Sequence, residues 1–316
     1  MNYPAMKYPG GVRIVEVGPR DGLQNEQMHL PTETKVALIE LLAEAGLRSI
    51  EAGSFVAPKW VPQMADTAAV LSRLRRRPGV AYPVLVPNLT GLERALAAGA
   101  EEIAVFAAAS ETFSNRNINC SIEESLSRFA PVIEQALAGG IRIRGYVSCV
   151  LGCPYEGEIA PVAVARVAGQ LYRMGCYEIS LGDTIGTGTP LKARRLVERT
   201  CSEVPLSAIA LHFHDTYGQA LANLLACLEL GAAVVDSAIA GLGGCPYARG
   251  ASGNVATEDV TYMLAGMGIE TGLDLDRLCA AGAMISSALG RPTRSRVAQA
   301  LTANHPQAAT ASFSRS

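Results

Sequence analysis

The chain passes eight times from a short β-type run to a helical pattern, and this alternation limits the folds open to it. The eight candidate strands span residues 12–17, 49–52, 82–86, 102–107, 142–148, 177–181, 209–213 and 234–240. Several are nearly continuous apolar runs, as expected for a parallel sheet that is covered on both faces. Eight such units predict an α/β protein, a single (β/α)8 TIM barrel.

A helical pattern follows each strand, and one more helix follows the eighth unit. These helices are expected at residues 32–45, 65–76, 91–98, 121–138, 163–174, 191–204, 219–230, 257–267 and 275–288. A doubly wound open sheet would need a Gly-rich nucleotide turn after the first strand, and GPRDGLQ does not supply GxGxxG. We therefore expect one barrel domain over residues 12–300 with a short C-terminal helical extension. Residues 1–11 are expected to form an N-terminal extension and residues 301–316 a flexible tail.

Composition excludes several classes of function. The 27 basic and 29 acidic residues nearly cancel, which gives no electrostatic reason to expect nucleic-acid binding. No apolar run approaches the length of a membrane span. The first eleven residues carry no targeting pattern, so a cytoplasmic protein is expected. The eight cysteines are spread through apolar stretches, which favours reduced thiols.

Lysine is scarce, and its positions exclude one kind of chemistry. Only Lys7, Lys35, Lys59 and Lys192 occur, and none falls on a predicted strand. A Schiff-base aldolase of this fold needs a lysine on a barrel strand. The alternative for carbon–carbon chemistry is an enolate stabilised by a metal ion and an arginine.

Polar residues follow the first two predicted strands, where a barrel carries its active site. Arg20 and Asp21 form a turn between Gly18-Pro19 and Gly22. Taken alone, this turn is more typical of a solvated surface ion pair. Glu51 ends the second run among apolar residues and must find a partner, for which Arg20 is the nearest candidate.

The seventh strand carries His212 and His214. Side chains alternate along a strand, so both histidines share one face. Such a pair suits the chelation of one divalent ion, although two hydrogen-bonded core histidines would give the same pattern. Asn254 offers an oxygen that could complete a metal site.

The last loop, residues 241–254, holds five glycines and Cys245. A cysteine in such a loop could be a reactive acid or base, or an incidental small residue. Tyr146, Ser180 and Asp183 are polar side chains near the same rim. They could contact a substrate or only form hydrogen bonds inside the barrel.

These segments together resemble the 3-hydroxy-3-methylglutaryl-CoA lyase family of metal-dependent lyase and Claisen-type synthase barrels. The resemblance extends from about residue 12 to residue 300. Its motifs are VGPRDGLQNE (17–26), SFVAPKWVPQMAD (54–66), NINCSIEES (117–125), RGYVSCVLGCPYEG (144–157), GCYEISLGDTIGTGTP (175–190), HFHDTYGQALAN (212–223) and AGLGGCPYARGASGNVATED (240–259). The loop that bears the cysteine points to the lyase branch.

The resemblance implies cleavage of (S)-3-hydroxy-3-methylglutaryl-CoA to acetyl-CoA and acetoacetate. It implies that Mg²⁺ or Mn²⁺ is bound by the set Asp21, His212, His214 and Asn254. Arg20 would stabilise the enolate oxygen, Glu51 would orient Arg20, and Cys245 would be the catalytic cysteine. His212 is a further candidate for proton transfer.

The same resemblance implies an acyl-CoA thioester as the substrate. The residues expected to contact it are Arg20, Gln24, Asn117, Tyr146, Ser180 and Asp183. Dimers are common in the family, which is compatible with a homodimer. The pathway stays open between leucine catabolism, ketone-body formation and terpenoid breakdown.

Three other functions share parts of this pattern. A lyase for a longer 3-hydroxy-3-alkylglutaryl-CoA would use the same residues with a roomier pocket. A synthase that condenses acetyl-CoA with a 2-oxo acid would usually carry a further C-terminal region. A non-catalytic binding barrel would not need the full set of polar residues at the rim.

Overall fold

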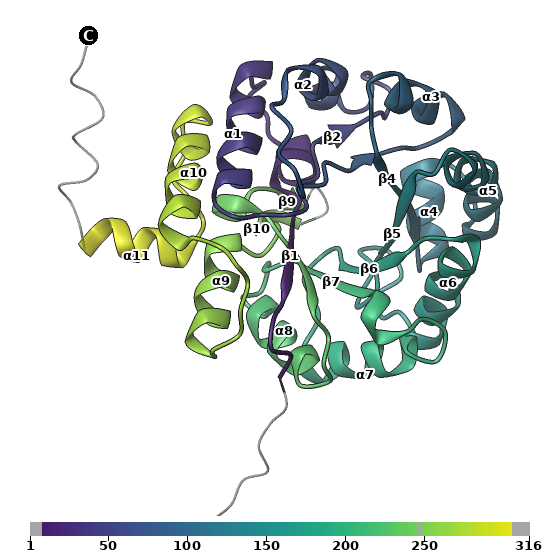
Figure 1. Ribbon diagram of the computed structural model, residues 1–316. Helices are drawn as coiled ribbons and strands as arrows, with labels where there is room; N and C mark the ends of the chain where they lie inside the picture. The colour runs from purple at the N-terminus through teal and green to yellow at the C-terminus, as the bar shows by residue number, and fades with distance from the viewer. Residues whose placement is uncertain (1–7, 246–247, 305–316) are drawn as a thin grey trace, which may run out of the picture.

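Eight parallel strands form the barrel in a computed structural model that describes residues 8–245 and 248–304 (Figure 1). The side chains of residues 245–252 and of residue 304 are not described. The strands are β1 (Arg13–Glu16), β2 (Gly53–Ser54), β3 (Val84–Leu85), β4 (Glu102–Ala108), β5 (Arg142–Ser148), β6 (Glu178–Asp183), β7 (Ile209–Phe213) and β8 (Val234–Ser237). They lie in the order β1-β8-β7-β6-β5-β4-β3-β2. A parallel bridge between Glu16 and Ile50 joins the two ends, which confirms the (β/α)8 barrel.

Helices surround the strands as an outer layer (Figure 1). They are α1 (Thr32–Glu44), α2 (Thr67–Arg73), α3 (Leu89–Ala97), α4 (Glu111–Ile118), α5 (Ile122–Ala138), α6 (Pro161–Met174), α7 (Pro190–Thr200), α8 (Ala220–Leu228), α9 (Thr257–Gly266), α10 (Leu275–Ala288) and α11 (Arg296–Asn304). Among the described residues, no helix is both long and apolar enough to cross a membrane.

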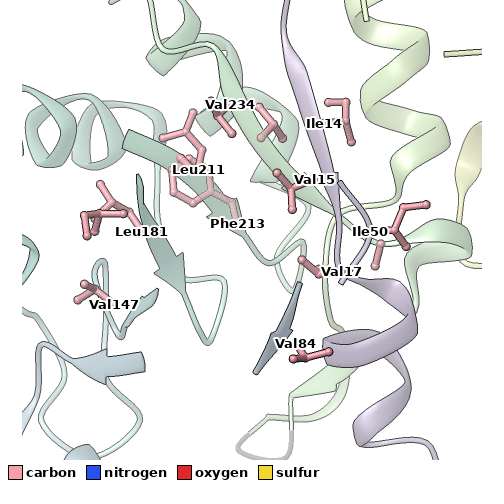
Figure 2. Close-up of a cluster of buried hydrophobic side chains, with 14 of the residues drawn as sticks. Ile14, Val15, Val17, Ile50, Val84, Val147, Leu181, Leu211, Phe213 and Val234 are labelled. Carbon is pink, nitrogen blue, oxygen red and sulfur yellow. The ribbon is translucent and has the colours of Figure 1, made fainter. Parts of the chain in front are cut away.

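Apolar side chains fill the space between the strands and this outer layer. Leu211 and Phe213 of β7 lie among Leu181 of β6 and Val147 of β5 (Figure 2), and all four are buried. The residues between them in sequence point the other way, because side chains alternate along a strand. Ala210 and His212 of β7 therefore face the barrel interior.

Two strand predictions differ most from the observed bounds. The second strand was expected at residues 49–52, but β2 is Gly53–Ser54, and only single bridges at Ser49 and Ile50 continue the sheet before it. The eighth was expected to reach residue 240, but β8 ends at Ser237. A 3-10 turn, η4 (Ile239–Gly241), follows, with Ala240 at a positive φ of 55°. After this turn, the Leu242 carbonyl accepts a hydrogen bond from Asn254 at 3.2 Å.

Helices α4 and α11 were not predicted. The N-terminal residues of α11 are held by Asp259, which accepts hydrogen bonds from the Arg296 and Val297 amides and from Ser295 Oγ. Helix α11 extends to Asn304 and so includes residues 301–304, which the sequence placed in a tail. The division into domains stays a prediction.

Candidate active site

A tight turn after β1 presents Arg20 and Asp21 to the barrel mouth. The turn, η1 (Gly18–Gly22), is a single π-turn in which the Gly22 amide donates to the Val17 carbonyl at 3.1 Å. Pro19 presets the backbone at its start. A Cβ on Gly22 would lie 2.6 Å from Leu242 Cβ, so only glycine lets the turn approach the last loop this closely.

Asp21 meets the two histidines of β7. His212 and His214 are buried on the same face of the strand, as predicted, with their ring centroids 5.4 Å apart. One ligand atom from each of Asp21, His212 and His214 lies within 4.8 Å of the others. Two imidazoles and a carboxylate at this spacing can share one divalent cation.

The charges and hydrogen bonds at this cluster fit a cation. His214 Nδ1 is buried and has no hydrogen-bond partner among the described residues, so a ligand nitrogen is available. Burial opposes the ionisation of Asp21, but Arg20 and both histidines lower its pKa to about 2. Burial, with His212 beside it, lowers the pKa of His214 to about 4. An ionised carboxylate and a neutral imidazole are the forms that bind metal.

Asn254 adjoins the same cluster. A bridge pairs it with His214, and its Nδ2 donates to Asp21 Oδ2 at 2.8 Å and to the Leu242 carbonyl at 3.2 Å. The structure therefore brings all four predicted metal ligands together.

Arg20 is buried and ion-paired to two carboxylates. Its Nε lies 2.8 Å from Glu51 Oε2, and its Nη1 donates to Asp21 Oδ1 at 2.9 Å. Its guanidinium also lies 5.4 Å from the centroid of the Tyr146 ring. Tyr146 donates to Glu51 at 3.2 Å. The predicted pairing of Arg20 with Glu51 is confirmed, and the surface-turn alternative is wrong, because Arg20 is 6% exposed.

Sequence reasoning missed the polar residues below this cluster. Asp236 accepts hydrogen bonds from Arg144 and Ser180, and its Oδ2 lies 3.2 Å from His212 Nδ1. Arg144 also pairs with Glu178 and donates to Tyr146 at 2.9 Å. Asp236 was visible as the one charge within an apolar run. However, only the β7–β8 register, which pairs it with His212, shows what it contacts.

Gln24 and Ser180, two more of the predicted substrate residues, are linked to the cluster by hydrogen bonds, directly or through Asp236. Gln24 donates to Asp21 Oδ1 at 3.4 Å. Ser180 faces the interior through its bond to Asp236 at 2.8 Å. Asp183, at the end of β6, has one buried oxygen with no hydrogen-bond partner in the part of the chain that the structure describes, and burial raises its pKa to about 6.

Two predicted residues are not joined to the cluster by any described contact. Asn117 lies on α4 with its side chain exposed. Cys245 lies on β9 (Gly244–Cys245), which pairs with β10 (Ala248–Ser252). Its side chain lies outside what the structure describes.

The fold and the cluster define an α/β-barrel protein with a candidate divalent-metal centre at the carboxyl ends of its strands. The chain belongs to the HMGL-like family, whose family model matches residues 11–285.

Individual relatives agree with this family. The chain is 62% identical over 293 residues to the mitochondrial hydroxymethylglutaryl-CoA lyase of Bos taurus, covering 93% of this chain and 90% of the relative. The crystal structure of hydroxymethylglutaryl-CoA lyase from Pseudomonas aeruginosa matches with a TM-score of 0.93 and 59% identity, covering 94% and 99% of the two chains. A structure of an HMG-CoA lyase from Acinetobacter baumannii in complex with coenzyme A and 3-methylmalate matches at 0.88 with 38% identity, covering 92% and 95%.

Proposed function

We propose that the protein is a metal-dependent lyase that cleaves (S)-3-hydroxy-3-methylglutaryl-CoA to acetyl-CoA and acetoacetate. The observation that carries the proposal is the cluster of Asp21, His212 and His214 beside the buried Arg20–Glu51 pair. Hydroxymethylglutaryl-CoA lyases about 60% identical to this chain support the choice of substrate.

Asp21, His212, His214 and Asn254 are proposed to hold Mg²⁺ or Mn²⁺. When bound, such an ion supplies Lewis acidity that lowers the pKa of an alcohol. The carboxylate and amide oxygens suit Mg²⁺ and Mn²⁺, and the two imidazoles suit Mn²⁺ or Zn²⁺ better than Mg²⁺. The family resemblance favours Mg²⁺ or Mn²⁺.

The reaction is a retro-Claisen cleavage. A base removes the proton of the C3 hydroxyl, the C3–oxygen double bond forms as the C2–C3 bond breaks, and the electron pair of that bond becomes the acetyl-CoA enolate. Protonation at C2 completes acetyl-CoA and leaves acetoacetate. The proposed role of Arg20 is to stabilise the enolate oxygen, because its guanidinium is fixed beforehand by Glu51 and Asp21. Gln24, Tyr146, Ser180, Asp183 and Asn117 stay predicted substrate contacts.

The proposal is tested by measuring acetoacetate release from the methylglutaryl thioester with and without EDTA. Chelation is expected to abolish cleavage, and Mg²⁺ or Mn²⁺ is expected to restore it. Undiminished activity after exhaustive chelation would contradict the metal centre. A higher kcat/KM for a longer 3-alkyl thioester would instead identify the sister activity.

Cys245 is proposed to transfer a proton to or from the reacting atoms, on the strength of the family resemblance. We expect Cys245→Ser to lower kcat by about 10²-fold or more while Mn²⁺ binding is retained. Cys201→Ser, which changes an exposed cysteine, is the matched control. Equal kcat values for Cys245→Ser and the parent protein would remove Cys245 from the mechanism.

The homodimer, the cytoplasmic location and the pathway expected from the sequence stay predictions. Measuring the molar mass in solution tests the homodimer. The cytoplasmic location and the pathway are tested by experiments in cells.

A further inference from the structure

Asp236 is a fully buried carboxylate on β8 that lies beneath the candidate metal centre. Its Oδ2 atom is 3.2 Å from His212 Nδ1. The other ring nitrogen, Nε2, is 3.8 Å from Asp21 Oδ2. The imidazole of His212 is therefore placed between two carboxylates, one on each of its nitrogens.

The surroundings of Asp236 keep it a hydrogen-bond acceptor. Arg144 donates to Oδ1 at 2.6 Å and to Oδ2 at 2.8 Å, and Ser180 Oγ donates to Oδ2 at 2.8 Å. A guanidinium can only donate, so both oxygens of Asp236 act as acceptors, and the contact of Oδ2 with His212 is a hydrogen bond when Nδ1 carries the proton.

We propose that Asp236 is a positioning residue that holds His212 in the tautomer with the proton on Nδ1, which leaves the lone pair of Nε2 for the divalent cation. The inference rests on the metal centre proposed above. A metal-ligating histidine commonly donates its other ring nitrogen to a carboxylate in this manner, which fixes the ring and strengthens it as a ligand.

His214 provides a contrast within the same cluster. Its Nδ1 is buried without a hydrogen-bond partner among the described residues, so the tautomer of that ring is not set by a carboxylate. Of the two histidines, only His212 has a described carboxylate at the nitrogen away from Asp21. Loss of Asp236 should therefore change His212 and leave the His214 ring signals in place.

The tautomer can be read in the metal-free protein by ¹⁵N NMR of the imidazole nitrogens. The chain holds four histidines, and His212→Gln removes one set of signals and so assigns it. At a pH where the ring is neutral, we expect Nδ1 of His212 to show the shift of a protonated nitrogen and Nε2 that of an unprotonated one. The reverse pattern would overturn the proposal without any variant of Asp236.

Two variants separate the hydrogen bond from the charge. Asp236→Ala removes the acceptor, and we expect a mixture of His212 tautomers with Mn²⁺ affinity weakened about 10- to 100-fold, measured by calorimetry. Asp236→Asn keeps a neutral acceptor. We expect its amide oxygen to take the Oδ2 position, which Arg144, Ser180 and His212 contact, so this variant should retain the wild-type tautomer. Its amide nitrogen then replaces the Oδ1 acceptor of Arg144, so we expect lower stability and recovery of only part of the affinity.

Glu178→Gln is the matched control, because it removes a buried carboxylate charge from the same Arg144 and has no described contact with a histidine. A merely structural role for Asp236 would make Glu178→Gln and Asp236→Ala alike, with the tautomer unchanged and stability lowered in both. If the wild-type protein itself binds no Mn²⁺, the proposed metal centre fails. If the wild type binds Mn²⁺ and Asp236→Ala binds it equally with the same tautomer, only the role of Asp236 fails.

Discussion

At the barrel mouth, the charged side chains of Arg20 and Glu51 are buried away from water. Arg20 and Glu51 are 6% and 0% exposed, and each would be costly to bury alone. Burial raises the pKa of Glu51, and the Arg20 guanidinium opposes that rise. Because the charges are paired before any substrate arrives, Arg20 is held in place for the reaction rather than ordered during it.

Replacing Arg20 tests this role. We expect Arg20→Met to lower kcat for the methylglutaryl thioester by about 10²- to 10³-fold, with Mn²⁺ affinity changed much less, as measured by steady-state kinetics and calorimetry. The variant leaves Glu51 buried without its partner, so a loss of stability is expected as well.

The double variant Arg20→Met with Glu51→Gln separates the two effects. It removes both charges, so we expect stability to recover while kcat stays low. Recovery of kcat together with stability would show that Arg20 acts on folding rather than on the reaction.

At the scale of elements, two short turns bring the metal ligands together. The turn η1 carries Asp21, and the segment after η4 passes so close that Gly22 has no room for a side chain beside Leu242. Glu16 joins the two turns, because its Oε1 accepts from the Gly18 amide at 2.8 Å and the Ile239 amide at 2.9 Å. The position of Asp21 therefore depends on contacts between the first and last parts of the barrel.

Gly22→Ala tests this dependence. The added Cβ would meet backbone and Cβ atoms of Leu242, so we expect a loss of about 1–3 kcal/mol in the free energy of unfolding. Because Asp21 is the neighbouring residue, we also expect weaker Mn²⁺ binding, measured by calorimetry.

Gly266→Ala is the matched control for the same substitution. Gly266 ends α9, and a Cβ there meets nothing within 4 Å, so we expect unchanged or slightly higher stability. Unaltered unfolding and Mn²⁺ binding in Gly22→Ala would contradict the close approach of the two turns.

At the scale of the whole molecule, buried carboxyl groups make stability depend on pH. Glu258 is 0% exposed and lies against η4, where the Ala240 amide donates to it at 3.0 Å. Burial, with Glu16 nearby, raises the pKa of Glu258 from 4.5 to about 8. A raised pKa means that the folded state holds the proton of Glu258 more tightly than the unfolded state does. The resulting stabilisation of the fold is complete below pH 4.5 and is lost as the pH rises through about 8.

The pH dependence can be measured by urea unfolding between pH 5 and pH 9. We expect the wild-type free energy of unfolding to fall across this range by an amount on the order of a few kcal/mol. Glu258→Gln cannot ionise, so its curve should be flatter. Glu123→Gln, at an exposed position of α5, should follow the wild type. Parallel curves for all three proteins would show that Glu258 does not titrate in this range.

The hydrophobic pattern located most of the barrel, and each of its failures has an identifiable structural cause. The predicted bounds of β5 and β7 agree with the structure, and each strand pairs along its whole length with one neighbour, β5 with β4 and β7 with β6. Strand β2 was misplaced by several residues because it is very short, with only two register pairs to β3. A hydrophobic pattern over so few residues does not locate a strand. Helix α11 was missed because it is stabilised by Asp259, a residue nearly forty positions earlier in the chain.

The sequence by itself determined the kinds of side chain available and the face on which His212 and His214 lie, since both follow from local alternation. It also excluded an imine-forming lysine on a barrel strand. Only the tertiary structure decided that Asp21 lies with those histidines and that Asp236 lies against His212 Nδ1. These contacts join residues far apart in the chain, and the register and closure of the barrel, which set them, come from packing of the whole sheet rather than from any one segment.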